Sequence, residues 1–395
     1  MQTRPCCVEV DASVLEDNFR LLSELAAPHA ELLAIVKANA YGHGLAICAP
    51  AAVRAGAHWL GVTSVEEGVA ARALCADAQI LVISGVFPGQ ATNIFRHNLT
   101  PIAWESWQLA ELELAARNAA LGPSSVPIHL EIDTGMSRQG TSIERLPQLL
   151  TRFSAESPLK LDGIMTHLFA ADEADNVITR EQFELLAAGL DQVAFAGLHP
   201  QWLNVGNSAA LLSGQAATVA ELAARHSMKA LMRPGLALYG LAPKYDPPFD
   251  DRQSETLVEA SRQLHPVLTW KSKVVSVRSV PAGTVVGYNG TFVATEPMRL
   301  ALIAAGYADG LDRRLGNRFS LLVRGQRAPL VGRISMDQAV LDVTEIGEVA
   351  PGDEVVLLGT QGSEIISAFD HADAAGTIPW EIFTRISERV SRIQR

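Results

Sequence analysis

The chain has 395 residues, of which 48% are hydrophobic and 19% are charged. A typical domain has roughly 100–200 residues, so we expect two domains with sizeable cores. With 32 basic and 43 acidic residues the net charge is −11, which argues against nucleic acid or an anionic membrane as the main partner. Only 6 of the basic residues are lysines, so a lysine in an apolar segment stands out.

The sequence shows no sign of secretion, of a membrane helix or of a metal site. Its start, MQTRPCCVEVDAS, lacks the apolar stretch of a signal peptide, and no run approaches the ~20 apolar residues of a membrane span. Cys6, Cys7, Cys48 and Cys75 have neither metal-ligand spacing nor the density of a disulfide framework. We therefore expect a soluble cytoplasmic protein without a metal.

The first 240 residues or so alternate short apolar runs with longer segments of helical character, such as Glu105–Ala120 and Thr179–Phe195. The apolar runs have the length and the bounding residues of buried parallel strands. They are Leu33–Lys37, His58–Val62, Ile80–Ser84, Pro101–Trp104, Pro127–Asp133, Leu161–His167, Gln201–Val205 and Ala230–Arg233. Eight such units predict a (β/α)8 TIM barrel. An open doubly wound sheet is less favoured, because no Gly-rich dinucleotide turn follows the first run.

The second part of the chain reads as a mainly-β domain. A Pro/Asp-rich linker, Ala242–Asp251, leads into short β-branched runs separated by turn residues. These runs are Val274–Val280, Leu300–Ala304, Ser320–Val323 and Gln338–Val343. A helix is expected near Ile378–Ile393. The predicted boundaries are 1–241 for the barrel and 242–395 for the β domain, with roughly the first 10 residues as a further strand of the β domain.

Lys37 is the first candidate for chemistry, because it ends an apolar strand and faces the mouth of the predicted barrel. Burial disfavours its ammonium form and makes the amine a better nucleophile. Other polar residues follow later strands at the same face: Glu131, Asp133, Arg138, Thr166, His167, Asn207, Ser208 and Arg233. Gly235 and Leu236 add backbone N–H groups there. The last strands of such barrels often bind phosphate. A Schiff-base lysine beside a phosphate site indicates pyridoxal 5'-phosphate or a phosphosugar aldolase.

Several segments of the chain are similar to alanine racemases, a pyridoxal-phosphate family with a barrel and a β domain. These segments are Ala34–Gly44, Ile132–Met136, Met165–His167, Asn207–Ala210, Arg233–Gly240, Gly287–Tyr288, Gly306–Gly310, Val331–Gln338 and Gly376–Ile378. They occur in order over nearly the whole chain. The resemblance implies a homodimer in which each β domain completes the partner's active site.

The resemblance also implies roles for individual residues. Lys37 would hold the cofactor as an internal aldimine and act as one base, while Tyr288 would act on the opposite face of the substrate Cα. Tyrosine has an unperturbed pKa of about 10, so it needs positive charge or a hydrogen-bond network nearby, which His167 and the arginines are expected to supply. The remaining implied ligands of the cofactor are Tyr41, Arg138, His167, Asn207, Ser208, Arg233, Gly235 and Leu236.

Further implied residues concern the substrate. Met336 would meet its carboxylate through the backbone, together with Arg138. Tyr307, Arg313 and Arg333 would line the access corridor, with Asp337 nearby, although an ordinary surface role is almost as well supported for these arginines and the tyrosine. Arg233 would face the pyridine nitrogen, and because arginine does not readily give up its proton, that nitrogen would stay unprotonated.

Two positions depart from the family pattern. Many members carry a carbamylated lysine where this chain has Glu131, so we expect Glu131 to supply negative charge to Arg138 without modification. Trp380 replaces a tyrosine at the substrate entrance, which weakens any expectation of strict alanine specificity.

The sequence therefore predicts an L-/D-alanine racemase that uses two bases and supplies D-alanine for peptidoglycan. A serine racemase or one of broad specificity is the first alternative, since Trp380 alters the entrance. A non-catalytic pyridoxal-phosphate carrier is less favoured, because it would need only the barrel and not an arginine-rich β domain bearing Tyr288. A decarboxylase of similar architecture is a further, less favoured alternative, which release of carbon dioxide without racemisation would support.

Overall fold

The computed structural model describes residues 4–173, 177–244 and 259–395. Within these ranges the chain forms two compact units. The barrel unit takes residues 13–40 and 48–265, and the β unit takes the residues up to 12 together with 41–47 and 266–395. Residues 245–251 of the expected linker lie outside the described residues.

Eight parallel strands close into a barrel through pairing of the first strand with the last, which confirms the predicted fold class. The strands are β2 (Ala30–Ile35), β3 (Trp59–Val62), β4 (Gln79–Val82), β5 (Thr100–Ala103), β6 (Val126–Glu131), β7 (Leu159–Met165), β8 (Trp202–Asn204) and β9 (Lys229–Met232). Most of their residues are buried, as expected of strands covered on the outside by helices and filled on the inside by side chains.

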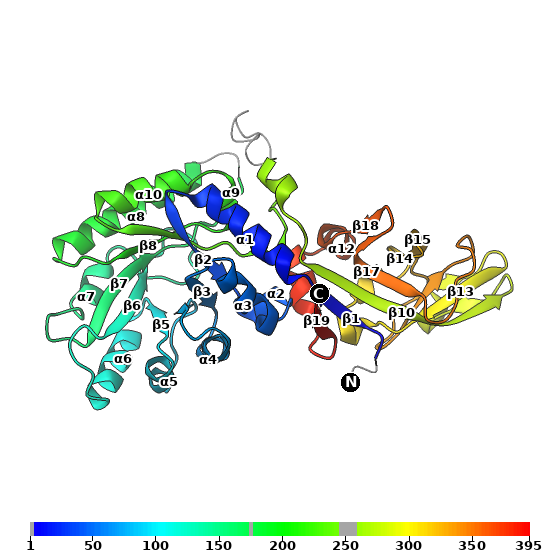
Figure 1. Cartoon of the computed structure of the whole chain (residues 1–395), viewed down its shortest axis with the longest axis horizontal. Helices are drawn as coiled ribbons and strands as arrows, with labels where there is room; N and C mark the ends of the chain where they lie inside the picture. Colours follow the sequence, from blue (N-terminus) through cyan, green and yellow to red (C-terminus); the bar gives the residue numbers. More distant parts are fainter. Residues whose placement is uncertain (1–3, 174–176, 245–258) are drawn as a thin grey trace. The chain divides into compact units, whose positions relative to one another are not determined.

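Helices surround these strands (Figure 1). They are α1 (Ala12–Ala26), α2 (Lys37–Tyr41), α3 (Leu45–Arg54), α4 (Val65–Leu74), α5 (Ala91–Arg96), α6 (Ser106–Asn118), α7 (Leu146–Leu150), α8 (Val177–Phe195), α9 (Ser208–Leu212), α10 (Ala216–Arg225) and the 3-10 turn η1 (Leu236–Tyr239). The helix predicted at Glu105–Ala120 is α6, where the Glu105 and Gln108 side chains cap the first turn reciprocally. None of the described helices has the length and apolar character needed to cross a membrane.

Aromatic rings fill the middle of the barrel. The ring of Trp59 lies 5.6 Å from that of Trp202 in an edge contact and 5.9 Å from that of His129. Gly163 faces His129, and a Cβ on this glycine would lie only 2.5 Å from the imidazole. Burial lowers the pKa of His129 to about 4, so this histidine is a neutral part of the core.

The β unit contains a nine-stranded sheet and a short hairpin. The sheet consists of β1 (Cys7–Val10), β10 (Leu268–Val280), β13 (Met298–Ile303), β14 (Ser320–Val323), β15 (Gln326–Pro329), β16 (Ala339–Asp342), β17 (Glu354–Gln361), β18 (Glu364–Ile366) and β19 (Ser391–Gln394). The long strand β10 pairs with β1, β13 and β17 and so joins most of the sheet (Figure 1). The hairpin pairs β11 (Val285–Val286) with β12 (Phe292–Val293).

Short helices complete the β unit: η2 (Tyr288–Gly290), η3 (Tyr307–Asp309), η4 (Arg313–Leu315), α12 (Ala368–Ala375) and α13 (Pro379–Arg385). The helix predicted near Ile378–Ile393 is wrong in its second half, because α13 ends at Arg385 and the chain then forms β19. The reason is long-range pairing: β19 lies parallel to β1, with Cys7 opposite Ser391. Local helical spacing carries no information about such a partner.

Candidate active site

The carboxyl ends of the barrel strands bring together the charged residues that the sequence singled out. Glu131 is the last residue of β6, Arg233 directly follows β9, and Lys37 and His167 lie two residues beyond β2 and β7. Because parallel strands end at the same face of a barrel, these side chains gather there. The pKa of each of them is shifted by at least one other member of the group and by Arg138.

Lys37 opens an unusual turn. Ala38, Asn39, Ala40 and Tyr41 all have φ between 50 and 55°, in the left-handed region. Such residues cost roughly 1–2 kcal/mol each when they carry a Cβ. Glu67 supports the turn, since its carboxylate accepts the backbone N–H of Ala38 at 2.7 Å and that of Thr63 at 2.8 Å. The turn therefore changes the direction of the chain directly after Lys37.

The Lys37 amine has a lowered pKa. Burial is the largest cause, and the positive charges of Arg138 and Arg233 act in the same direction, against a smaller opposite effect of Glu67. A larger share of the amine is therefore uncharged near neutral pH than for an exposed lysine. An uncharged amine is the form that attacks a carbonyl or accepts a proton.

Arg233 is held firmly at the centre of the group. It is 4% exposed, and its Nη1 donates to both the backbone and the side-chain oxygen of Asn204 at 2.7 and 2.6 Å. Its Nη2 donates to Thr166 O at 2.9 Å and lies 3.3 Å from His167 Nδ1. Burial lowers the pKa of Arg233 to about 10, so the guanidinium remains protonated at neutral pH.

His167 is neutral in this environment. Burial lowers its pKa to about 3, and the charges of Arg233, Arg138 and Lys37 contribute further. Because arginine can only donate, Nδ1 of His167 is the acceptor and Nε2 carries the hydrogen. Of the groups expected to support a catalytic tyrosine, neutral His167 can therefore contribute a hydrogen bond, whereas the arginines are the available cations.

Glu131 is buried, with 2% exposure, and its closest partner is one that the sequence reading missed. Its carboxylate accepts a hydrogen bond from the Gln139 side chain, which also donates to Ile83 O at 3.0 Å. Burial raises the pKa of Glu131 to about 7, against the effects of Gln139, Arg233 and Arg138. Among the described residues Glu131 forms no ion pair within 4 Å, so the charge of Arg138 lowers its pKa only from a longer distance.

Ser208 and the turn after β9 form another part of the barrel mouth, which we call the Ser208 corner. The Ser208 hydroxyl oxygen accepts the backbone N–H groups of Gly235 at 2.9 Å and Ala237 at 3.2 Å. With both lone pairs used in this way, the single O–H remains available to donate. Asn207 caps α9 through Ala210 N at 3.1 Å and donates to Leu168 O at 3.2 Å, so its side chain shapes this corner.

The other predicted residues belong to the β unit. Tyr288, Met336 and Tyr307 are 67%, 53% and 42% exposed, on loops between strands. Arg313 and Asp337 are exposed, whereas Arg333 and Trp380 are half-buried. Gly287 has a φ of 75°, and a Cβ there would lie 3.1 Å from Arg333 N, so the Tyr288 loop packs closely on the Arg333 backbone. Tyr41 is grouped with the β unit, and burial raises its pKa to about 12.

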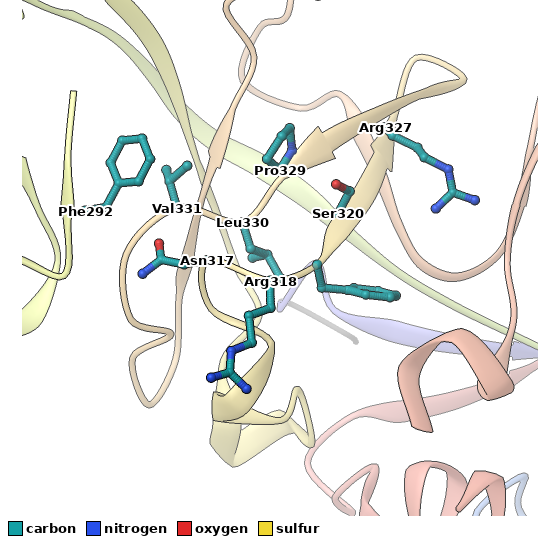
Figure 2. Close-up of a pocket in the computed structure, with 9 residues that line it drawn as sticks. Phe292, Asn317, Arg318, Ser320, Arg327, Pro329, Leu330 and Val331 are labelled. Carbon is teal, nitrogen blue, oxygen red and sulfur yellow. The ribbon is translucent and has the colours of Figure 1, made fainter. Parts of the chain in front are cut away.

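The β unit also has a hollow of about 400 Å³ that contains none of the predicted site residues. Phe292, Pro329, Leu330 and Val331 line it, and Arg318 and Arg327 stand at its rim, pointing in different directions (Figure 2). Arg327 is already paired with Glu364 at 2.8 Å. Within the described residues, no group of three histidine, cysteine or acidic side chains is arranged to hold a metal ion.

The barrel combines a half-buried lysine of lowered pKa, a fixed arginine and a serine hydroxyl held by the turn after its last strand. This combination defines an enzyme of the pyridoxal-phosphate class. Comparisons with known proteins agree. Residues 10–243 match the model of the alanine racemase N-terminal domain, and residues 267–394 match that of its C-terminal domain. The chain belongs to the alanine racemase family, whose members are pyridoxal-phosphate-dependent isomerases, which confirms the resemblance inferred from the sequence.

Individual relatives cover the chain almost completely. It is 37% identical to the alanine racemase of Halothermothrix orenii over 99% of this chain and 97% of that protein. The alanine racemase of Streptomyces lavendulae has a similar structure, with a TM-score of 0.88, 33% identity and coverage of 100% and 98%. That of Bartonella henselae, with a TM-score of 0.83 and 26% identity over the full length of both chains, contains covalently bound pyridoxal phosphate.

Proposed function

We propose that this enzyme interconverts L- and D-alanine with Lys37 and Tyr288 as two acid/base groups on opposite faces of the substrate Cα, and that Tyr288 comes from the partner subunit. Racemisation requires a proton to leave one face and another to arrive on the other. The observation that carries the proposal is that the chain has both a lysine of lowered pKa at the barrel mouth and an exposed tyrosine on a loop of the β unit.

The residues at the barrel mouth fit the cofactor. Lys37, Arg138 and Arg233 make this region rich in positive charge, which suits the anionic phosphate and a carboxylate. Ser208 has an O–H to donate to a phosphate oxygen, and Leu236 would add a backbone N–H group, while Gly235 would orient Ser208 by donating its N–H to the hydroxyl oxygen. When bound, pyridoxal phosphate withdraws electrons from the substrate and so makes its Cα proton more acidic.

Each residue then has a definable task. Lys37 would anchor the cofactor and move a proton at Cα through its Nζ, since its lowered pKa favours the uncharged amine more than in an exposed lysine. Arg233, fixed by Asn204 and Thr166, would hold the ring nitrogen without giving it a proton. Neutral His167 would place its Nε2–H beside the cofactor, and Arg138 would bind the phenolic oxygen and the substrate carboxylate.

Tyr288 would supply the second acid/base group. Its exposure leaves the phenol accessible to another subunit, and Arg333 lies beside its loop. The family's shared active site requires a homodimer, so a fully active monomer would contradict the proposal. Met336 would present its backbone to the substrate carboxylate, and Tyr307, Arg313, Arg333 and Asp337 would line the access corridor from the partner.

We further propose that the enzyme works in the cytoplasm and supplies D-alanine for peptidoglycan. In support, its four cysteines are thiols, three of them buried, as expected in a reducing compartment. Restored growth of a bacterium that lacks its own alanine racemase, without added D-alanine, would test this role.

The substrate range is the second open point, since half-buried Trp380 lies in the first turn of α13 where the family has an entrance tyrosine. The test is a racemisation assay on L-alanine, L-serine, L-lysine and L-arginine with added cofactor, and with Lys37→Ala as the inactive control. We expect alanine to have the highest kcat/KM. A higher value for serine or for a basic amino acid would reassign the substrate class.

A further inference from the structure

Two carboxylates and two arginines form a cluster within the β unit, and of these four residues only Asp337 has a role above. We call Arg4, Asp309, Asp337 and Arg389 the Asp309 cluster. Arg4 Nη2 and Arg389 Nε each donate to one oxygen of the Asp309 carboxylate, both at 2.7 Å. The same two arginines also reach Asp337, Arg4 through the backbone oxygen at 3.0 Å and Arg389 through the carboxylate at 2.8 Å.

Asp309 is the buried anchor of the cluster. Its side chain is fully buried, whereas those of Arg4 and Arg389 are 34% and 37% exposed. Beyond the two arginines, the carboxylate accepts Gly306 N at 2.9 Å, and Asp309 O accepts Ser387 N at 3.1 Å. A buried carboxylate bound by two guanidinium groups has little freedom to move, since any displacement would leave its charge without partners.

The cluster joins the two loops that carry Tyr307 and Met336. Tyr307 N donates to Ser335 O and Ala308 N to Met336 O, both at 3.0 Å. Gly306 permits this close approach, because a Cβ there would lie 2.4 Å from Met336 O. The loop with Tyr307 thus lies directly on the peptide of Met336, and Arg4 and Arg389 connect the two loops by binding both Asp309 and Asp337.

We propose that Asp309 is a positioning residue that, through Arg4 and Arg389, fixes the Met336 peptide and Tyr307 for recognition of the substrate carboxylate. This inference rests on the proposed function, in which these two residues face the substrate in the partner's site. Asp309 itself does not touch the substrate. It sets the orientation of a peptide whose misplacement by a fraction of an ångström weakens binding of a small anion.

The test compares Asp309→Asn with Glu364→Gln. Both remove a carboxylate charge from an arginine pair of the same unit, but the pair of Glu364 with Arg327 is solvent-exposed, and Arg327 hydrogen-bonds to Glu364 and Ile365 and not to either loop. For Asp309→Asn we expect KM for L-alanine and the inhibition constant of propionate, which has alanine's carboxylate without its amine, to rise about tenfold each. The kcat and the absorption spectrum of the bound cofactor should change little, and Glu364→Gln should match the wild type.

Arg389→Lys keeps the inference testable if Asp309→Asn does not fold. Lysine retains the charge but has a single donor group and cannot span Asp309 and Asp337 as the guanidinium does. It should also raise KM and the propionate constant together. A lowered Tm with both constants unchanged would show that the cluster only stabilises the fold and would overturn the inference. An inactive wild type would instead refute the proposed function.

Discussion

Replacement of Ser208 by alanine tests how the barrel holds the cofactor. The Ser208 oxygen accepts two backbone N–H groups, so its hydrogen is the one available to a phosphate oxygen. Hydrogen bonds to charged groups contribute about 1.5–3 kcal/mol, which corresponds to roughly a tenfold to hundredfold weaker Kd for pyridoxal phosphate. The freed N–H groups of Gly235 and Ala237 can turn toward the phosphate and compensate in part, so we expect a value near tenfold.

The assay is a titration of the cofactor-free enzyme with pyridoxal phosphate, followed by absorbance. Ser213→Ala is the matched control: Ser213 is also buried, but its hydroxyl donates only to Ala210 O at 3.2 Å, a backbone oxygen that also accepts Gln215 N. The control should bind cofactor as the wild type does. An unchanged Kd for Ser208→Ala would refute the assignment of this corner as the phosphate site.

Further predictions follow for other positions. Lys37→Ala should abolish racemisation together with the visible absorption of covalently bound cofactor; loss of only one would argue against its double role. Tyr288→Phe should slow exchange of the Cα proton of one alanine enantiomer in D₂O far more than of the other, whereas equal losses would contradict its one-sided action. Burial raises the pKa of Glu131 from 4.5 to about 7, so ionisation of this residue destabilises the folded state. This destabilisation is absent below pH 4.5 and complete above pH 7. The difference in unfolding free energy between Glu131→Gln and the wild type should therefore increase in favour of the variant by about 2–3 kcal/mol from pH 5 to pH 8. Urea unfolding of the cofactor-free enzymes measures this difference, and a difference that does not change with pH would disprove the pKa shift. Tyr239→Phe, which removes the buried bond to Ile35 O at 2.8 Å, should lower the unfolding free energy by about 1–2 kcal/mol in the same assay, and an unchanged value would show that this bond contributes nothing.

The barrel and its cluster of charged residues could be predicted because both follow from the order of the strands. Once eight parallel strands are recognised, Lys37, Glu131 and Arg233 must lie at one face, wherever they occur in the sequence. The protonation state of His167 could not be predicted in this way, since it depends on burial and on two arginines that only the folded chain brings near.

Other features of the structure were not predicted from the sequence, for different physical reasons. The left-handed turn after Lys37 contains no glycine before Gly42, so the usual indicator of positive φ is missing until the turn is complete. Gln139 was overlooked beside Arg138, although its place next to a predicted ligand was a usable signal. Arg4 and Arg389 meet at Asp309 from opposite ends of the chain, and no local pattern encodes such a contact.

The shared active site is the central claim, and subunit mixing tests it most directly. Lys37→Ala and Tyr288→Phe subunits are each expected to be nearly inactive alone. When the two are co-expressed, half of the dimers combine one subunit of each kind, and one of their two sites then contains both Lys37 and Tyr288. Activity should return to about a quarter of the wild-type value per subunit. No recovery, in a mixture shown to contain heterodimers, would mean that both residues act within one chain, and substantial activity of either variant alone would mean that the replaced residue is not catalytic.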